Sequence, residues 1–347
     1  MPADTHLLIF VSCQRRLYTA VTTTIRHLVI YPPGTLYITG QAIALSNAVS
    51  KLLECIMFNF IVSEDEVDDA QFGFKKHHST GDCTFVFKRT VDYYRRNGSH
   101  VFDGFIDFNK AFDSVDYWLL FNKLLDCSSS VSCSLSFYLL AFWYSHQSVR
   151  VCWQGVMSSC FSIGNGVRRG GILSPFLFRF YIRDLIRKIT NSSVGCVVFH
   201  KSFNLLAYAD DLVLLAPSWV GLQILIEMLA AEADVIGLSV NTKKTVTMIF
   251  SPYDKQKCLH TTFPQFSLSG SYLCSVSSFK YLGHIIEDTL RDDGDITREL
   301  KCLFTRANLL IRRFWRCSIG VKLQFLKTFC MCFFMILDYG HLTESVL

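Results

Sequence analysis

The stretch that decides the fold is Leu205-Leu-Ala-Tyr-Ala-Asp-Asp-Leu-Val-Leu-Leu-Ala216, in which two apolar runs flank a pair of aspartates. Leu205–Tyr208 and Leu212–Ala216 have the composition of buried strands. Adjacent carboxylates repel each other and are costly to bury, so Asp210 and Asp211 are expected at the turn of a hairpin. Carboxylate oxygens on a rigid hairpin suit Mg²⁺, although an ordinary Asp-containing turn is the simpler alternative.

A third carboxylate, Asp107, lies in a strand expected at Val101–Phe108. A strand-end carboxylate beside a hairpin-tip carboxylate can hold two metal ions about 3.5–4 Å apart, which is the arrangement for in-line displacement at a phosphate. The alternative for Asp107 is a loop or helix-capping role. The two segments, Val101–Phe108 and Leu205–Ala216, therefore indicate a metal-dependent phosphoryl transfer.

Composition restricts the class of protein. The 347 residues are enough for two or three packed lobes, and half are hydrophobic, which excludes wholesale disorder. The net charge of +5 is too small for a polybasic tail. The longest wholly apolar run, Phe329–Leu337, has nine residues, whereas a spanning helix needs roughly 20. The 14 scattered cysteines form no C-x-x-C pair, so we expect a soluble intracellular protein, nuclear or cytoplasmic, without a membrane or disulfide partner.

Helical and strand patterns alternate irregularly along the chain. Asp113 is expected to cap a helix that continues to Leu124, and Ser174-Pro175 is a strong helix start. Further elements are expected as helices at 42–56, 174–189 and 220–236 and from Ile296 onward, and as strands at 245–250 and 278–282. Because strict βαβ alternation is missing, the fold class is predicted to be α+β.

Several segments, taken in order, resemble the motifs of reverse transcriptases, and the resemblance is closest to LINE-type (non-LTR) retrotransposons. It covers roughly residues 38–335. The matching segments are Gln71–Thr80 (fingers), Asp107–Asp113 (motif A), Gly166–Pro175 (motif B), Tyr208–Asp211 (motif C), Asn241–Thr245 (motif D) and Phe279–Gly283 (primer grip). Each motif alone is weak, but six in the family's order make coincidence implausible.

The resemblance implies a right-hand polymerase with fingers, palm and thumb. Its palm is expected to be a small antiparallel sheet backed by helices, and its thumb to be helical. It implies fingers and palm at 37–283 and a truncated thumb at 284–347. Residues 1–36 show no clear period and are expected to be a divergent leader, poorly ordered or outside the fold. The implied activity is extension of a DNA primer on an RNA template from deoxynucleoside triphosphates with two Mg²⁺, for which Mn²⁺ is a substitute. The oligomeric state stays open.

The resemblance also carries roles onto matching residues. Asp107, Asp210 and Asp211 would hold the metals, and Lys244 would act at the leaving pyrophosphate. The nucleotide would be bound by Lys75, Lys76, Phe108, Phe112, Arg169 and Gly170. Primer and template would be held by Tyr208, Tyr281, Gly283, Arg306, Arg312 and Arg313, the last three from a C-terminal stretch rich in Lys and Arg. Core, turn or solvated-surface roles are the alternatives for these residues.

Arg169 departs from the family pattern, because motif B usually carries Gln there. An Arg is charged and has no acceptor, so it grips a phosphate or blocks the site. This leaves open a decayed or co-opted copy that binds nucleic acid without polymerising. A related polymerase of the intron-maturase or telomerase type is another alternative. No segment resembles an endonuclease or RNase H domain, and the chain is expected to be a fragment of an element's open reading frame.

Overall fold

The computed structural model describes residues 6–13, 17–24, 28–30, 36–38, 48–61, 68–75, 77–126, 131–153, 156–254 and 262–330. These residues group into two compact units. The first comprises residues 1–74, 107–189 and 228–241, and the second comprises residues 75–106, 190–227 and 242–347.

The second unit is built on a five-stranded sheet of order β11-β12-β5-β13-β16. The strands are β5 (Val101–Ile106), β11 (Leu205–Tyr208), β12 (Asp211–Ala216), β13 (Val246–Phe250) and β16 (Cys274–Ser275). β5 occupies the centre and pairs antiparallel with β12 on one side and with β13 on the other. Only the edge pair β13–β16 is parallel. This is the small, mainly antiparallel sheet that the sequence predicts.

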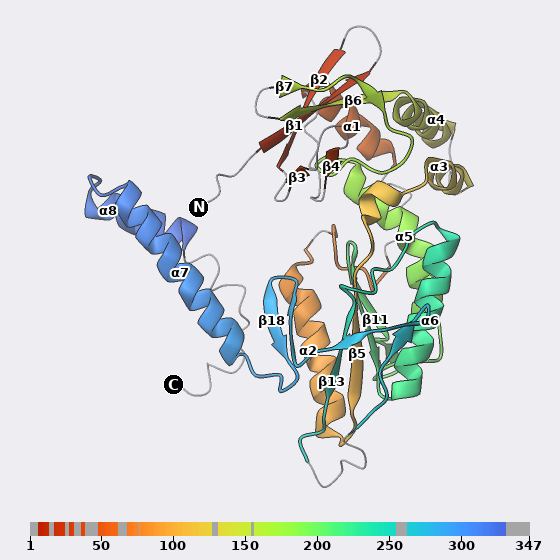
Figure 1. The fold of residues 1–347 in the computed structure, drawn as a ribbon, viewed down its shortest axis with the longest axis vertical. Helices are drawn as coiled ribbons and strands as arrows, with labels where there is room; N and C mark the ends of the chain where they lie inside the picture. The colour runs from red at the N-terminus through yellow and green to blue at the C-terminus, as the bar shows by residue number, and fades with distance from the viewer. Residues whose placement is uncertain are drawn as a thin grey trace. The chain divides into compact units, whose positions relative to one another are not determined.

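Helices cover both faces of this sheet (Figure 1). On one face lies α2 (Thr80–Arg96), whose Phe87 ring is 5.8 Å from Phe105 and 6.0 Å from Phe250. On the other face lies α6 (Trp219–Val235). Gly104 faces the N-terminal half of α6, where a Cβ would be 3.6 Å from Leu222. The sheet is therefore buried on both faces, which explains why every residue of β5 is buried.

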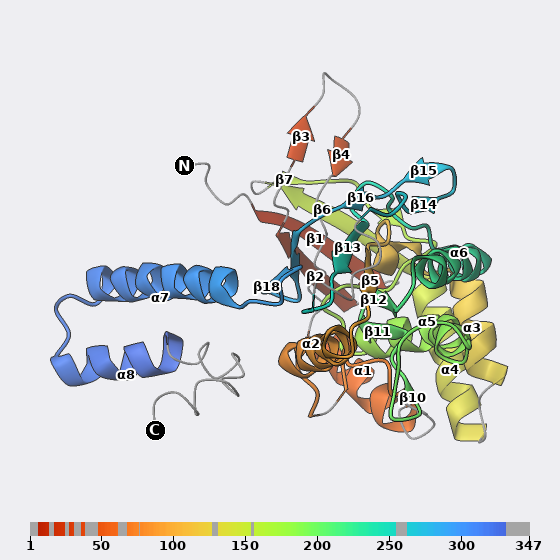
Figure 2. The ribbon, with the colours of Figure 1, turned by 90° about the horizontal axis from the view of Figure 1, so that it is seen from below.

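Three two-stranded hairpins and a helical hairpin complete the second unit. The strand pairs are β9 (Val197–Val198) with β10 (Lys201–Ser202), β14 (Ser267–Leu268) with β15 (Ser271–Tyr272), and β17 (Ser278–Tyr281) with β18 (His284–Glu287). After β18, α7 (Asp293–Arg313) and α8 (Ile319–Phe329) run back along each other (Figure 2).

The first unit combines a sheet of β1 (His6–Cys13), β2 (Leu17–Thr24), β6 (Gln147–Trp153), β7 (Val156–Met157) and β8 (Phe161–Ser162) with helices. β3 (Leu28–Ile30) pairs with β4 (Leu36–Ile38). The helices are α1 (Ala48–Ile61), the 3-10 turn η2 (Ala111–Ser114), α3 (Tyr117–Asp126), α4 (Val131–Ser145) and α5 (Ser174–Thr190). β1, β2 and β3 lie within the segment predicted to be a leader. No described helix combines the length and the apolar character needed to cross a bilayer.

Most elements expected from the sequence are confirmed, including β5, α5, α6, β13 and β17. One expectation is wrong. Asp113 does not cap a helix, because it lies inside the 3-10 turn η2. Asp116 has that role instead, since its carboxylate accepts a hydrogen bond of 2.9 Å from the Leu119 N–H at the start of α3. Four residues of tight turn therefore separate the strand-end segment from the helix, and the capping pattern belongs to the second aspartate.

Asp103 is a fully buried carboxyl in the middle of β5. Its cross-strand partners are apolar, Leu215 on β12 and Met248 on β13. Among the described residues, neither of its oxygens has a hydrogen-bond partner. Burial raises its pKa well above the usual value, so the side chain is held in its neutral form.

We expect Asp103→Val to stabilise the protein at neutral pH by about 1–3 kcal/mol, because an unpartnered buried polar group is removed. A carboxyl with a raised folded pKa favours the folded state most below the unfolded value of 3.8 and loses this contribution as pH rises towards the folded pKa. The stability gap between variant and parent should therefore widen above pH 4. Urea unfolding across pH measures it.

Thr247→Val on the neighbouring strand is the matched control, because Thr247 is equally buried but its hydroxyl donates to the Cys274 carbonyl. This variant should not stabilise the protein. A gap between Asp103→Val and the parent that stays constant with pH would contradict the neutral-acid interpretation.

Candidate active site

The turn between β11 and β12 carries the paired carboxylates. Tyr208 and Asp211 are the last cross-strand pair, so Ala209 and Asp210 form a two-residue turn. Ala209 has a φ of 58°, a backbone conformation that residues other than glycine rarely adopt. Asp211 is exposed and Asp210 is half-buried. Backbone strain of this kind is commonly concentrated at functional sites, where the surrounding structure maintains it.

The charge of Asp211 affects the pKa values of two buried polar groups in the same unit. The Cys83 thiol and the Tyr281 hydroxyl are 3.5 Å apart. Burial raises the pKa of Cys83 to about 11, and the negative charge of Asp211 contributes to the rise. The pKa of Tyr281 is also raised by burial, with a contribution from Asp211. Both groups are therefore neutral and add no charge beside the carboxylate turn.

Asp107 opens the segment that follows β5, in the first unit. Its carbonyl accepts a hydrogen bond of 2.7 Å from the Asn241 N–H, and Phe108 forms a β-bridge with Val240. Lys110 has a φ of 47° before the 3-10 turn begins. The segment is thus held by backbone contacts to Val240 and Asn241, at the start of motif D.

Phe112 lies on the 3-10 turn and is held between two side chains. The Phe178 ring stacks on it at 4.2 Å with an interplanar angle of 15°, and the Arg169 guanidinium carbon lies 5.0 Å from its centroid. Burial raises the pKa of the adjacent Asp113, against the opposing effect of Arg169 and Lys110. Arg169, the residue that departs from the family pattern, therefore contacts the aromatic ring expected to lie under the nucleotide sugar.

The glycine-rich turn of motif B is anchored on the same 3-10 turn. The Gly166 and Val167 N–H groups donate to the carbonyls of Val115 and Phe112, each at 2.8 Å. A Cβ at Gly166 would lie 2.9 Å from the Asp113 backbone, so only glycine fits there. Gly170 is exposed and has a φ of 97°. These contacts bring together Phe112, Arg169 and Gly170 of the predicted nucleotide residues.

The sequence reasoning missed a buried hydrogen-bond chain behind this turn. The Arg168 Nε donates to Gln147 at 2.6 Å, Gln147 donates to the Tyr117 hydroxyl at 3.0 Å, and Tyr117 donates to the Gly166 carbonyl at 2.8 Å. The Arg168 guanidinium also lies 4.8 Å from the Trp143 ring centroid. The three residues come from separate segments, so no local pattern indicated them.

Glu54 was also not predicted from the sequence. Its carboxylate is buried and accepts a hydrogen bond from the Ile172 N–H at the end of the glycine-rich turn. It lies on the side of α1 that buries Met57 and Ile61, opposite Val49, Leu52 and Ile56, which are exposed. The apolar stripe in the sequence therefore pointed to the wrong face of this helix, and the buried carboxylate carried no local signal.

The predicted lysines lie on exposed or half-buried loops. Lys75 is half-buried, and its carbonyl accepts a hydrogen bond from the His78 N–H. Lys244 is exposed in the turn that leads into β13. Lys76 lies outside the described residues. Neither described lysine is held in the core, so both are accessible to an anionic ligand.

The two primer-grip residues differ in exposure. Tyr281 is buried and packs against Phe87 and Phe105, with ring centroids 6.1 and 5.3 Å away. Its ring therefore fixes the β17–β18 hairpin to the sheet. Leu282 and Gly283 form the turn, with φ values of 47° and 91°. A ligand at this hairpin would meet the turn rather than the Tyr281 ring.

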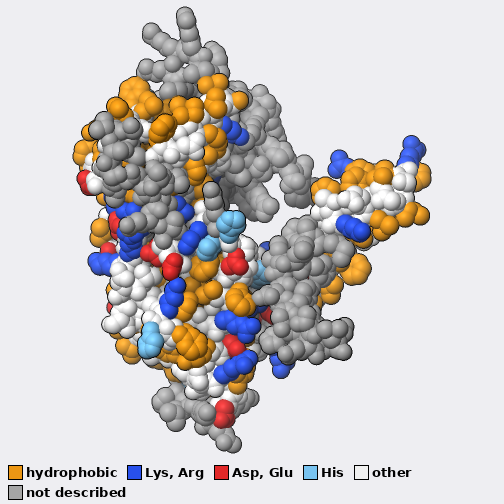
Figure 3. All heavy atoms as spheres, turned by 180° about the vertical axis from the view of Figure 1, so that it is seen from behind, with side chains coloured by type: hydrophobic (Ala, Val, Ile, Leu, Met, Phe, Trp, Pro, Cys, Tyr) orange, Lys and Arg blue, Asp and Glu red, His pale blue; other side chains and the backbone are white. Residues whose placement is uncertain are grey.

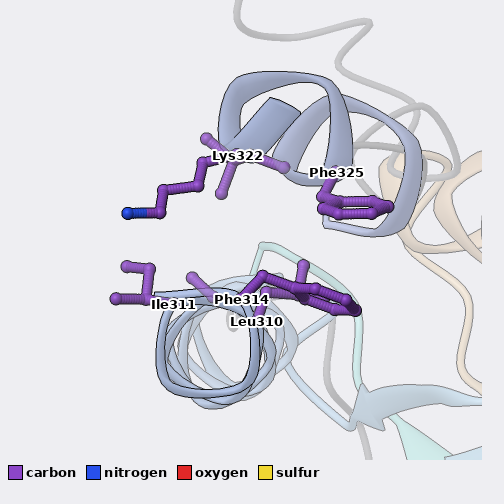
Figure 4. Close-up of a pocket in the computed structure, with 7 residues that line it drawn as sticks. Leu310, Ile311, Phe314, Lys322 and Phe325 are labelled. Atoms are coloured by element: carbon purple, nitrogen blue, oxygen red, sulfur yellow. The ribbon is translucent and has the colours of Figure 1, made fainter. Parts of the chain in front are cut away.

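The C-terminal helices expose both cations and apolar side chains (Figure 3). Arg312 and Arg313 are exposed in the last turn of α7, and Arg306 is half-buried one and a half turns earlier. Between α7 and α8 lies a small apolar pocket that Lys322 flanks (Figure 4). Phe314 and Phe325 close it, with ring centroids 4.5 Å apart. The predicted basic residues thus lie on a packed helical pair.

A buried carboxylate attaches α7 to the β17–β18 hairpin. Asp295 accepts hydrogen bonds from His284 Nδ1 at 2.8 Å, the Ile285 N–H at 2.9 Å and the Arg298 guanidinium at 2.8 Å. Burial alone would raise the pKa of Asp295, but these donors outweigh it and lower the pKa to about 2. Asp295 is therefore ionised, and its charge holds the start of α7 in place.

The chemistry of the donor set suits a hard cation. Asp210 and Asp211 offer carboxylate oxygens at an accessible turn, and Mg²⁺ commonly takes one or two carboxylates together with substrate phosphates and water. In the described part of the chain, no group of three or more His, Cys, Asp or Glu residues is arranged to hold a metal by itself. The carboxylate turn therefore fits a metal bound together with a phosphate substrate.

Comparison with known proteins identifies the family of this chain. The sequence matches the family described as reverse transcriptase (RNA-dependent DNA polymerase) over residues 41–286. The chain belongs to the reverse transcriptase family. It is 26% identical over 247 residues to the Pol polyprotein of retrotransposable element R2DM of Drosophila melanogaster, covering 70% of this chain and 23% of that protein. Enzymes of this family generally use divalent metal ions.

A second reverse transcriptase relative is the RNA-directed DNA polymerase from mobile element jockey of Drosophila funebris, 26% identical over 86% of this chain and 32% of that protein. The curated relatives are polymerases of non-LTR retrotransposons. The chain spans about a quarter to a third of their length.

A solved structure shows the same fold. Telomerase from Candida tropicalis, in complex with a fragment of telomeric RNA, aligns with a TM-score of 0.52 and 11% identity over 87% of this chain and 51% of that chain. The fold is therefore the α+β right-hand polymerase fold that the sequence predicts, as expected for a reverse transcriptase.

We expect Asp295→Asn to destabilise the second unit by about 2 kcal/mol, because charge-assisted hydrogen bonds are lost. Since the folded pKa of Asp295 is lowered to about 2, the carboxylate stabilises the fold above pH 4, and this contribution is lost as pH falls towards 2. Hydrogen exchange of α7 amides and chemical denaturation measure both effects.

Asp293→Asn is the matched control, because Asp293 is exposed in the same helical turn. It should leave exchange in α7 nearly unchanged. Equal effects of the two substitutions would show that the buried contacts of Asp295 do not hold α7.

Proposed function

We propose that this chain catalyses RNA-directed DNA synthesis, extending the 3′-hydroxyl of a DNA primer on an RNA template. The observation that carries the proposal is the carboxylate turn at Tyr208–Asp211, on a strand whose neighbour in the sheet leads directly into Asp107. Leu212, the residue after Asp211, is the register partner of Ile106, the residue before Asp107. Membership of the reverse transcriptase family and the strained Ala209 support the same conclusion.

In this proposal Asp107, Asp210 and Asp211 hold two Mg²⁺, with Mn²⁺ as a substitute. The bound ions would supply charge neutralisation for the attacking and leaving oxygens of the phosphoryl transfer. The protein's part is to present the carboxylates on a rigid sheet, so that little reorganisation accompanies the reaction. Lys244, exposed beside β13, would offer a cation or proton to the leaving pyrophosphate.

The nucleotide would lie against the segment from Phe108 to Phe112. Phe112 is already fixed between Phe178 and Arg169, so the position of its ring beside the sugar would be preformed. A bulky ring there disfavours a 2′-hydroxyl and so selects deoxynucleotides. Gly170 would allow close approach of the backbone to the nucleotide, and Lys75 and Lys76 would contact the triphosphate as compact cations.

The template and primer would be held by backbone and phosphate contacts. We assign primer placement to Tyr208 and to the turn at Gly283. Tyr281 would anchor that turn through its ring contact with Phe105 in the sheet. Arg306, Arg312 and Arg313 would contact phosphates of the RNA–DNA duplex as parts of a helical thumb, with salt-sensitive affinity. The telomerase relative, which was solved with a fragment of telomeric RNA, supports an RNA template as partner.

Arg169 supports a second candidate, a reverse-transcriptase-like protein that binds nucleic acid without polymerising. Its guanidinium lies over the Phe112 ring, where the family has an uncharged amide. A positive charge at this position would bind a phosphate without reproducing the amide's acceptor. Duplex binding without incorporation in a primer-extension assay would favour this candidate.

The proposal predicts that Asp210→Ala abolishes primer extension. Losing a metal ligand removes several kcal/mol of transition-state stabilisation, which corresponds to roughly a thousandfold loss of rate. Incorporation of deoxynucleotides on an RNA template with Mg²⁺ is the measurement.

Asp234→Asn serves as the control, because Asp234 is an exposed acid near the end of α6. It should keep the parent rate. Incorporation that persists in Asp210→Ala, with the fold verified by circular dichroism, would overturn the assignment of the carboxylates.

Arg169→Gln is predicted to raise the rate of incorporation severalfold, because the amide can both donate to and accept from a nucleotide or template group. The steady-state kcat and KM for deoxynucleotides report the change. Arg150→Gln, at an exposed position on β6, removes the same charge elsewhere and should change neither value. A lower rate in Arg169→Gln would mean that the guanidinium contributes to nucleotide binding.

A further inference from the structure

The outer face of α2 carries aromatic and cationic side chains that the proposed reaction does not use. Phe85 and Tyr93 are exposed on this face, eight residues or about 12 Å apart along the helix. The charged residues on the same face are Asp82, Lys88, Arg89, Asp92 and Arg96. Three cations and two carboxylates therefore lie on a surface that also exposes aromatic rings.

Arg89 is positioned between the two aromatics. Its guanidinium carbon lies 5.1 Å from the Phe85 ring centroid. Within the described part of the chain it forms no ion pair with a carboxylate, whereas Arg96 pairs with Asp92 at 2.9 Å and Lys88 with Asp292 at 2.6 Å. Arg89 is thus a cation whose charge is available to a ligand.

The turn of the β9–β10 hairpin adds a third aromatic ring to this face. Val198 pairs with Lys201, so Phe199 and His200 form a two-residue turn. Their φ values are 47° and 64°, in a position where Asn-Gly is the usual sequence. Phe199 is 86% exposed, and its ring centroid lies 5.9 Å from that of Tyr93. Exposure of the large Phe199 ring and the strained backbone that carries it are each unfavourable to folding. Their combination indicates a functional role for Phe199.

The hairpin is fixed to α2 by Tyr94. Its hydroxyl donates to the Val197 carbonyl at 2.9 Å and accepts from the Val197 N–H at 2.7 Å. The Tyr94 ring also contacts the Tyr93 ring edge-on at 5.6 Å. Phe199 is therefore held beside Tyr93 in a defined position rather than on a free loop.

We propose that Phe85, Arg89, Tyr93 and Phe199 form a binding platform for single-stranded nucleic acid on the outside of α2. Bases would stack on the three rings, and Arg89 would contact the backbone phosphates, which is how proteins bind single strands without reading sequence. The platform lies on the side of α2 opposite the buried Cys83 and Phe87, which face Tyr281 and the sheet.

This inference goes beyond the proposed polymerase reaction, from which it takes only the class of ligand. The spacing of the rings and the Arg89 cation between Phe85 and Tyr93 distinguish the platform from a plain apolar protein interface. It is separate from the basic α7–α8 pair, which would contact duplex phosphates.

The test uses the full chain and a fluorescently labelled oligouridine of about 12 nucleotides, with anisotropy as the readout. Phe199→Gly should weaken binding about tenfold, because a stacking ring is lost. The same substitution relieves the positive φ, so the melting temperature should stay equal or rise. Weaker binding together with unchanged or greater stability cannot result from misfolding.

Arg89→Ala should weaken binding for every sequence and reduce the salt dependence of log K by about 0.7, the value for one phosphate contact on a single strand. Tyr272→Ala is the matched control, because Tyr272 is an exposed aromatic on β15 of the same unit. It should leave affinity and salt dependence unchanged.

Cross-linking with 4-thiouridine oligonucleotides locates the ligand independently of catalysis. Peptides covering residues 80–96 and 197–202 should carry the cross-links, in the parent and in Asp210→Ala alike. Oligonucleotide affinity that Phe199→Gly does not lower, or cross-links confined to α7 and α8, would overturn the platform. Loss of primer extension with retained cross-links would overturn only the polymerase proposal.

Discussion

Backbone pairing of β5 with two neighbours is the constraint on which the candidate site depends. β12 and β13 hold β5 from both sides, and helices cover both faces of the sheet. Every residue of β5 is consequently buried, including the carboxyl of Asp103. A side chain can leave this environment only where the strand ends, and Asp107 is the first residue after that end. The same pairing fixes the register of β12, and hence the position along β5 at which the turn with Asp210 lies.

Strong local patterns made much of the fold predictable. The apolar runs around Asp210 and Asp211 and the Ser174-Pro175 start are local signals, and the structure has β11, β12 and α5 where they indicate them. The error at Asp113 has a physical reason. Two aspartates three residues apart both fit a cap, and only the 3-10 turn imposed by packing under Gly166 decides between them.

Contacts between segments far apart in the sequence could not be predicted from local sequence patterns. Arg168, Gln147 and Tyr117 form one hydrogen-bond chain from three segments, and their spacing in sequence carries no period. The burial of the Tyr281 ring was likewise invisible, because it depends on Phe87 and Phe105 from other elements. The roles of the site residues rest on the family pattern, whereas their local geometry comes from the structure.

The strand order also has a consequence for synthesis on the ribosome. β5 is complete about a hundred residues before β12 begins, and β13 follows later still. At roughly 5–20 residues per second, β5 is synthesised on the order of ten seconds before its first partner strand. During that time Val101–Ile106 is an unpaired edge. In the unpaired strand Asp103 is in water, where its pKa has the usual value of 3.8, and it is therefore charged. That charge interrupts the apolar stretch and would act as a gatekeeper against aggregation in the nascent chain, at the expense of stability in the finished protein.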